Sequence, residues 1–198
     1  MSHRDIFNLI YSNNLWGHGS GAGSLAENTT DYRKFLHNFI RSNGITSVID
    51  IGCGDWQFSK LIDWTGISYV GVDVSDVVLS NTQKFTRDGI SFLHADARTD
   101  PLPSADLVII KDVMQHWSNN DIQIFLPRLN NFQQALITNG FHPSMNNRVN
   151  TEIQAGSFRP IDLRRAPFNL SGYYINWLKF DEPKWIFHWR RDGGNIGV

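Results

Sequence analysis

The chain has few of the cysteines and little of the net charge that mark specialised classes of protein. Its 198 residues include one cysteine, Cys53, and its formal net charge is −1. A lone cysteine excludes an intramolecular disulfide and a zinc site built from several cysteines. We expect it to be a small buried residue in a tight turn. The near-zero charge argues against a surface that attracts nucleic acid or an acidic membrane.

Long apolar runs are also missing. No stretch reaches the ~18 apolar residues of a membrane span, and the N-terminus lacks the apolar core of a signal peptide. We therefore expect a soluble, cytoplasmic protein. Hydrophobic residues make up 41% of the chain, which at this length suits a single domain with a full core.

What the chain does have is an alternation of strand and helix patterns. Repeated β-α units predict an α/β fold with a parallel sheet and helices on both faces. Pro127 should kink the last helix or mark its restart. Strands are predicted at 46–52, 68–74, 90–96, 105–112 and 134–139, helices at 31–43, 58–64, 77–86 and 119–132, and a hairpin of 173–180 and 184–191 around Asp181-Glu-Pro183.

Three parts of the single domain follow from this pattern. Residues 1–30 form a lead-in, 31–139 a ligand-binding core, and 140–198 a polar loop with the hairpin. The lead-in carries a glycine-rich loop at 16–24. It could be a lid that closes over a ligand, with Trp16 as an aromatic cover, or a flexible surface segment.

The most informative motif runs from Val48 to Asp55, an apolar strand that ends in an acid and two close glycines. Such glycines let the backbone approach a nucleotide-like ligand. The acid, Asp50, would be poorly placed beside a pyrophosphate, but it suits a ligand that carries an ammonium group.

Two further acids follow at equal steps, since Asp73 and Asp96 end the next two predicted strands (73 − 50 = 23 and 96 − 73 = 23). Strand ends of a doubly wound sheet meet at one crevice. There, acids could accept hydrogen bonds from a ribose and from an adenine amino group. Singly, each could be a turn or N-cap residue, but together they indicate a nucleoside with an amino-acid arm.

These motifs resemble those of class I S-adenosylmethionine-dependent methyltransferases. The resemblance rests on Asp50-Ile-Gly-Cys-Gly54, Gly71-Val-Asp73, Ala95-Asp96-Ala97 and Asp106-Leu-Val-Ile-Ile-Lys-Asp112. It implies a doubly wound, seven-stranded, mostly parallel sheet with an antiparallel last strand, and S-adenosylmethionine as cofactor. It also implies that Gly52 and Gly54 pack under the methionine part, that Asp73 holds the ribose, and that Asp96 and Ala97 contact the adenine.

One departure from the family is the missing third glycine, where Asp55-Trp56 stands. Asp55 could contact the cofactor ammonium and Trp56 could wall the pocket; alternatively, the site is degenerate and inactive. The residues expected at the cofactor are Trp16, Ser20, Gly21, Asp50, Gly52, Cys53, Gly54, Asp55, Trp56, Asp73, Val74, Asp96, Ala97 and Lys111.

Catalytic candidates follow the fourth predicted strand. Asp112 should lie at the floor of the cleft, and His116, four residues on, is a plausible base for an acceptor hydroxyl. Lys111 could orient the acceptor. The alternatives are a capping aspartate, a histidine packed beside the adenine and a solvated lysine.

The segment 146–168 mixes amides, acids and arginines, which suits a polyhydroxylated or anionic acceptor, although an ordinary solvated loop would also be polar. Its length favours function. Asn150, Arg159 and Asp162 are the predicted substrate-binding residues. We expect no metal, because the acids that can be placed are used by the cofactor; the alternative is a magnesium ion in this segment that binds a sugar diol.

The predicted function is methyl transfer to a hydroxyl of a small polar acceptor, in the first place a sugar of a glycan. A tryptophan, a glycine-serine loop and a tyrosine-containing helix resemble small bacterial and viral methyltransferases linked to surface polysaccharides, so the partner could be a glycosyltransferase. Alternatives are another small molecule or a nitrogen acceptor, a non-catalytic cofactor-binding module, and a nicotinamide oxidoreductase. The chain lacks the Asn/Asp-Pro-Pro-Tyr signature that holds a flipped base or an amide in amino-methylating enzymes. This absence argues against a DNA or glutamine N-methyltransferase, and we expect no nucleic-acid partner.

Overall fold

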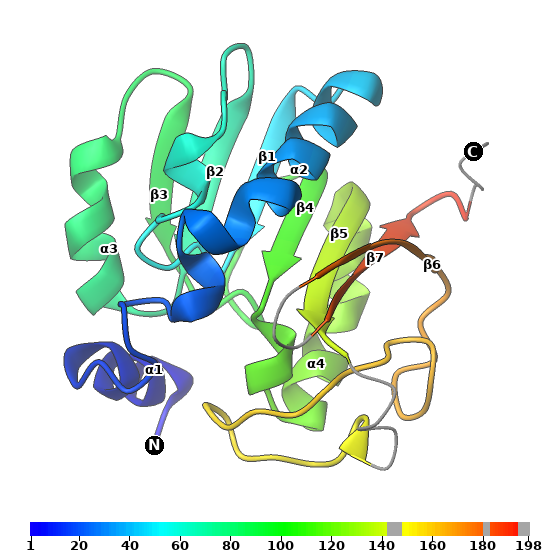
Figure 1. Ribbon diagram of the computed structural model, residues 1–198. Helices are drawn as coiled ribbons and strands as arrows, with labels where there is room; N and C mark the ends of the chain where they lie inside the picture. The colour runs from blue at the N-terminus through cyan, green and yellow to red at the C-terminus, as the bar shows by residue number, and fades with distance from the viewer. Residues whose placement is uncertain (142–147, 180–182, 194–198) are drawn as a thin grey trace. The chain divides into compact units, whose positions relative to one another are not determined.

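The computed structural model describes residues 1–141, 148–179 and 183–193. Its strands form one seven-stranded sheet in the order β3-β2-β1-β4-β5-β7-β6 (Figure 1). The pairs β1–β2, β2–β3 and β4–β5 are parallel, and β7 runs antiparallel to both β5 and β6. This confirms the predicted seven-stranded, mostly parallel α/β fold. The strands are β1 (Ser47–Ile51), β2 (Ser68–Asp73), β3 (Ile90–His94), β4 (Ala105–Lys111), β5 (Phe132–Gly140), β6 (Tyr173–Leu178) and β7 (Lys184–Arg190).

The chain divides into two compact units, Met1–Leu102 and Pro103–Val198. The first contains β1, β2 and β3 with the helices α1 (His3–Ser12), α2 (Thr30–Ser42) and α3 (Asp76–Thr82) and four short 3-10 turns. The second contains the other four strands, α4 (Asn119–Phe125) and the 3-10 helices η5 (Met114–His116) and η6 (Leu126–Asn131). The prediction of a single domain stays a prediction.

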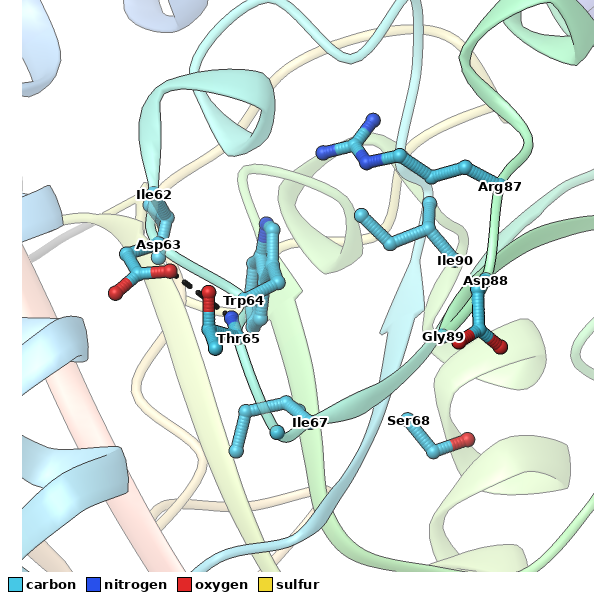
Figure 2. A pocket seen from close by; sticks show the side chains of 11 residues that line it. Ile62, Asp63, Trp64, Thr65, Ile67, Ser68, Arg87, Asp88, Gly89 and Ile90 are labelled. Atoms are coloured by element: carbon cyan, nitrogen blue, oxygen red, sulfur yellow. Dashed lines mark hydrogen bonds between the residues drawn. The ribbon is translucent and has the colours of Figure 1, made fainter.

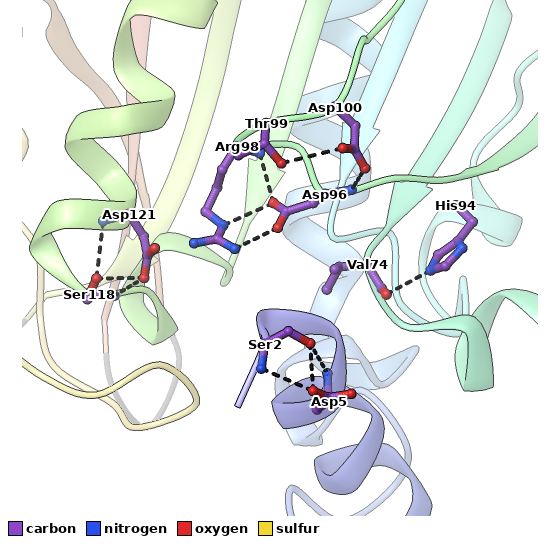
Figure 3. Close-up of polar contacts among 10 residues, drawn as sticks. All are labelled: Ser2, Asp5, Val74, His94, Asp96, Arg98, Thr99, Asp100, Ser118 and Asp121. Carbon is purple, nitrogen blue, oxygen red and sulfur yellow. Dashed lines mark hydrogen bonds and ion pairs between the residues drawn. The ribbon is translucent and has the colours of Figure 1, made fainter.

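Helix α1 was not predicted, because residues 1–30 were interpreted as a lead-in. Its start has a clear local cause. The Ser2 side chain accepts from the backbone of Asp5, and the Asp5 side chain accepts from the backbone of Ser2, a reciprocal cap (Figure 3). Phe7 and Ile10 on its inner face are buried, so packing of an amphipathic face stabilises the helix.

Trp56 belongs to the aromatic core of the first unit. It is 1% exposed at φ 60°, and its ring packs 5.8, 5.2 and 5.3 Å from the rings of Tyr69, Phe85 and Phe92. A buried tryptophan among aromatic rings contributes mainly packing energy. The structure thus places this residue in the core, not at the pocket wall that the sequence suggested.

The second unit confirms the prediction for Pro127. Helix α4 begins at a Ser118–Asp121 capping box (Figure 3) and ends at Phe125, where η6 begins with a proline in its first turn. A proline is tolerated in a first turn because its missing N–H would have no partner there. The predicted hairpin is also present as β6 and β7, whereas Phe180, Asp181 and Glu182 of its turn lie outside the described residues.

The other boundaries differ by a few residues. The expected helix at 58–64 is only a 3-10 turn at Ser59–Leu61, and the helix expected at 77–86 ends as a 3-10 turn at Gln83–Phe85. In the part of the chain that the structure describes, no helix has the length and apolar character to cross a membrane.

Candidate cofactor and acceptor sites

The turn after β1 needs its two glycines. Gly52 and Gly54 have φ of 70° and 55°, a left-handed conformation that side chains with a Cβ rarely adopt. A Cβ at Gly54 would also lie only 2.2 Å from Oγ of Ser20. Both Gly52 N and Cys53 N donate to the carbonyl of Val72 on β2. The turn is therefore tightly folded where the motif predicts close approach to a ligand.

Asp50 has a structural role beneath this turn. Its carboxylate is 2% exposed and accepts hydrogen bonds from Ser59 Oγ at 2.9 Å and from Tyr69 Oη at 2.6 Å. A buried carboxylate needs such donors to offset its desolvation. Asp50 thus ties β1 to β2 and to the following turn, a structural role that differs from the expected contact with a ligand ammonium.

Asp73, at the end of β2, links the two predicted motifs. One oxygen accepts from Gly54 N at 3.0 Å and the other from Ser75 N at 2.9 Å. Burial raises the pKa of Asp73, and the two backbone donors oppose that rise. The carboxylate therefore sits at the strand end where the resemblance places the ribose, with its orientation already fixed by the backbone.

A cavity of about 530 Å³ opens beside the ends of β2 and β3. It is lined by Val74, Ala95 and Asp96 together with residues of the N-terminal segment, among them His3. Such a cavity is large enough for a drug-sized ligand. Its apolar Val74 and polar Asp96 suit a purine ring with an amino group. Ala97 is buried beside this strand end and does not line the cavity.

Asp96 is already engaged by a cation (Figure 3). Arg98 donates from Nε to Oδ1 at 2.9 Å and from Nη2 to Oδ2 at 2.6 Å. Burial alone would raise the pKa of Asp96, but its bonds to Arg98 lower it below the ordinary value. A purine amino group at this place would share the carboxylate with Arg98, whose part in the site was not predicted.

A second cavity lies at the opposite end of the same strands (Figure 2). It is lined by the turn before β2, which includes Trp64 and Thr65, and by Arg87 and Asp88 before β3. Ligands of open α/β sheets bind outside the carboxyl ends of the strands. The cavity beside Val74 and Asp96 is therefore the better candidate for the cofactor.

The glycine-rich loop lies directly against the turn after β1. Ser20 Oγ donates to Asp55 Oδ1 at 2.7 Å and accepts from Asp55 N at 3.1 Å. Gln57 donates to the other oxygen of Asp55 at 2.6 Å. Asp55 was expected to contact the cofactor ammonium, but in the structure its carboxylate anchors this loop. Trp16 packs 5.9 Å from Phe7 and 5.6 Å from Tyr11, against helix α1.

We expect Gly19→Ala to open this loop. A Cβ at Gly19 would lie 2.1 Å from Oδ2 of Asp55, whereas a Cβ at Gly17 would meet nothing within 4 Å. Both glycines have positive φ, 71° and 66°, so Gly17→Ala is a matched control for backbone strain. Gly19→Ala should expose the loop to limited proteolysis much faster than the control does. Equal cleavage rates would contradict the close contact.

The second unit holds the predicted catalytic residues at the end of β4. Asp112 has φ 59°, and its Oδ2 accepts from Nζ of Lys111 at 2.6 Å and from Nζ of Lys184 on β7. Burial would raise the pKa of Asp112, but the charges of the two lysines outweigh it and hold the pKa well below its usual range. Oδ1 is buried and has no hydrogen-bond partner among the described residues.

Lys184 was missed because it lies in the predicted hairpin strand, 72 residues after Asp112. A lysine at a strand end is usually a solvated residue. Here it is 8% exposed, and only the pairing of β5 with β7 brings it to this place, where Gly140 is opposite Lys184.

His116 lies in η5 and contacts the polar loop that follows. Its Nδ1 is 2.8 Å from the carbonyl oxygen of Ser157, and its own carbonyl accepts from Gly156 N at 2.8 Å. Burial lowers the pKa of His116, as do the charges of Lys184 and Arg159, while Ser157 and Asp112 oppose the shift. A histidine that stays neutral near pH 7 keeps one ring nitrogen able to take a proton.

The three predicted substrate-binding residues form the buried frame of the polar loop. Arg159 is fully buried and donates to Met114 O and Asn119 Oδ1, both at 2.9 Å. Asn150 donates to the carbonyl of Asp162 and accepts from its N–H at 3.0 Å. The Asp162 carboxylate is 2% exposed and binds Arg164 and Arg165. This burial differs from the solvent-facing positions that acceptor binding would need.

Asn146 and Asn147 of the predicted acceptor segment lie outside the described residues. Within the described ranges, no three His, Cys, Asp or Glu side chains gather closely enough to hold a metal ion. The lone Cys53 is buried, and burial raises the pKa of its thiol well above the ordinary value. Its predicted place in a tight turn is confirmed.

Several solved structures with the same fold are methyltransferases. The N-methyltransferase NodS from Bradyrhizobium japonicum WM9, in complex with S-adenosyl-L-homocysteine, matches with a TM-score of 0.68 and 11% identity over 94% of this chain and 98% of that one. Magnesium protoporphyrin IX methyltransferase from Synechocystis PCC 6803, with bound S-adenosylmethionine, matches with a TM-score of 0.64 and 13% identity over 95% and 96%. Human N-acetylserotonin methyltransferase matches with a TM-score of 0.60 and 16% identity over 96% of this chain and 60% of that one.

No curated protein sequence matches the chain. The family model described as an O-methyltransferase domain matches residues 7–141, which is more than half of the chain. That range includes the glycine turn at Gly52 and Gly54, the carboxylate of Asp73 and the segment with His116. The chain therefore belongs to the O-methyltransferase domain family and is an enzyme that uses S-adenosylmethionine as its methyl donor.

Proposed function

We propose that this enzyme methylates a hydroxyl group of a small polar acceptor, in the first place a sugar. The observation that supports an oxygen acceptor is which ring nitrogen of His116 bears the hydrogen. A backbone carbonyl can only accept, so the 2.8 Å contact with Ser157 requires the hydrogen on Nδ1. Nε2 then carries the lone pair. A neutral imidazole of this kind suits an acceptor that must lose a proton during the reaction.

The cofactor half of the reaction belongs to the first unit. Asp73 would hold the ribose hydroxyls, and the cavity beside Val74 and Asp96 would take the adenine. The methionine arm would lie against the glycine turn at Gly52 and Gly54. S-adenosylmethionine supplies a methyl group on a sulfonium. The acceptor oxygen forms the new bond to this carbon as the carbon–sulfur bond breaks, and the hydroxyl proton passes to Nε2 of His116.

A sugar acceptor is supported by polar and aromatic groups of the second unit. Tyr173 and Trp177 on β6 are 56% and 55% exposed, and exposed aromatic faces of this kind are common at binding surfaces. The carboxylate of Asp112 is charged, and its Oδ1 is buried without a hydrogen-bond partner among the described residues, so an acceptor hydroxyl could bond to it only after the surrounding side chains move. Action alongside a glycosyltransferase would fit a glycan acceptor and is part of the same proposal.

Calorimetry with S-adenosylhomocysteine and with NAD tests the cofactor, and heat is expected with the first ligand alone. Transfer of a labelled methyl group to a panel of glycans, small alcohols and amines then tests the acceptor. Labelled ethers on sugars are the expected product. Labelled amines would instead assign a nitrogen acceptor, and binding without transfer to any member of the panel would favour a non-catalytic module.

A further inference from the structure

Gln115, which precedes His116, has both ends of its side chain in use. Its Oε1 accepts from the backbone N–H of Gly140 at 2.8 Å, and its Nε2 lies 3.3 Å from Nε2 of His116. The amide orientation follows from the first contact, because a backbone N–H needs an acceptor and only the amide oxygen is one. Nε2 of Gln115 is then a donor that faces the imidazole.

The environment of Gln115 holds this arrangement in place. The residue is 6% exposed, and its backbone N–H donates to Asn139 Oδ1 at 3.2 Å. Its carbonyl accepts from Arg159 N at 3.2 Å. Asn139 and Gly140 end strand β5, so the sheet itself orients the amide group. Buried polar groups with all partners supplied form rigid networks.

We propose that Gln115 is a positioning residue that holds His116 as the neutral tautomer, with the hydrogen on Nδ1 and the lone pair on Nε2. This inference rests on the proposed function, in which Nε2 takes the proton of the acceptor. Protonation of Nε2 would set two donors against each other, since the Gln115 amide nitrogen cannot accept a hydrogen bond. The Gln115 contact therefore favours the uncharged ring, and an acceptor hydroxyl that gives its proton to Nε2 must take the place of this contact.

Other charged groups around His116 both favour and disfavour protonation of its ring. Asp112 favours the charged ring, whereas Lys184 and Arg159 disfavour it, and burial disfavours it most. These groups come from the end of β4, from β7 and from the polar loop, and they influence the charge of the ring. Unlike Gln115, they do not explain which ring nitrogen carries the hydrogen.

The test is Gln115→Glu, read by NMR on the cofactor-free protein. One oxygen of the new carboxylate can still accept from Gly140, and the other now accepts from a protonated Nε2. The pKa of His116 should rise by about one unit or more, as expected for a carboxylate in hydrogen-bond contact. Gln123→Glu is the control, because Gln123 is exposed on helix α4 of the same unit. It should leave the titration of His116 unchanged.

Nitrogen chemical shifts supply a second readout. In the unmodified protein Nδ1 should show the shift of a protonated ring nitrogen and Nε2 that of an unprotonated one, and His116→Asn identifies the signals by their loss. An unchanged pKa in Gln115→Glu, or a hydrogen found on Nε2, would overturn the proposal. Neither readout needs methyl transfer, so a failure of the proposed function would be seen separately, in the calorimetry and the acceptor panel.

Discussion

His116→Asn should lower the methyl-transfer rate about 100-fold or more while the affinity for S-adenosylhomocysteine stays within about twofold. General base catalysis commonly contributes factors of ~10² to 10⁴, and the substitution removes the Nε2 lone pair. Asparagine keeps a donor for the carbonyl of Ser157, which the Nδ1 hydrogen occupies at 2.8 Å in the structure. The measurements are steady-state turnover with a labelled methyl donor and calorimetry.

The control for this variant is His37→Asn, a substitution of the same type on helix α2 of the first unit. It should retain the turnover of the unmodified enzyme. The rate of that enzyme should rise with pH through the pKa of His116 and level off above it, because the neutral imidazole is the active form. Since burial lowers this pKa, the rise should lie below pH ~6.5, the ordinary histidine value. Full turnover in His116→Asn would remove the residue from the role of base.

Asp73→Asn should weaken binding of S-adenosylhomocysteine by about 100-fold. The carboxylate accepts from Gly54 N and Ser75 N with one oxygen each. An amide would put its NH₂ group against one of these backbone donors. It would also remove the charge that, in the proposed cofactor site, accepts from the ribose hydroxyls. Hydrogen bonds to charged groups contribute about 1.5–3 kcal/mol each, and about 2.7 kcal/mol corresponds to a factor of 100 in Kd.

Asp88→Asn provides the matched comparison. Asp88 is exposed just before β3, at the end of the parallel strands opposite to the one that holds Asp73. It should bind the ligand as tightly as the unmodified enzyme. Thermal unfolding followed by circular dichroism shows whether Asp73→Asn is folded at the temperature of the titration. A folded variant with unchanged affinity would show that Asp73 does not hold the cofactor.

Much of this fold could be predicted from local patterns. The apolar runs of the strands, Gly52 and Gly54 in the turn and the carboxylate at the end of β2 all lie where the sequence suggested. Helix α1 was missed although its signal was present, since Ser2 and Asp5 form a capping box before an amphipathic run. That signal is short, and because a glycine-rich loop follows it, the whole segment was interpreted as irregular structure.

The site was predicted less well where a side chain finds its partner far along the chain. Asp55 was expected to face a ligand, but the hydroxyl of Ser20, 35 residues earlier, donates a hydrogen bond to its carboxylate. Asn150, Arg159 and Asp162 were expected to bind the acceptor because their types are polar. The structure instead buries them as the frame of their loop, and polarity alone could not distinguish these two uses.

The sequence by itself determined the class of this enzyme, because backbone conformation and strand burial depend on residues close together in the chain. Glycines with positive φ, apolar runs and acids at strand ends are local features of this kind. Only the tertiary structure decided which polar groups meet. The pairing of β5 with β7 brings Lys184 to Asp112, and the end of β5 orients Gln115 against His116. Contacts between residues far apart in the chain decide which donors, acceptors and charges meet, and no local pattern records them.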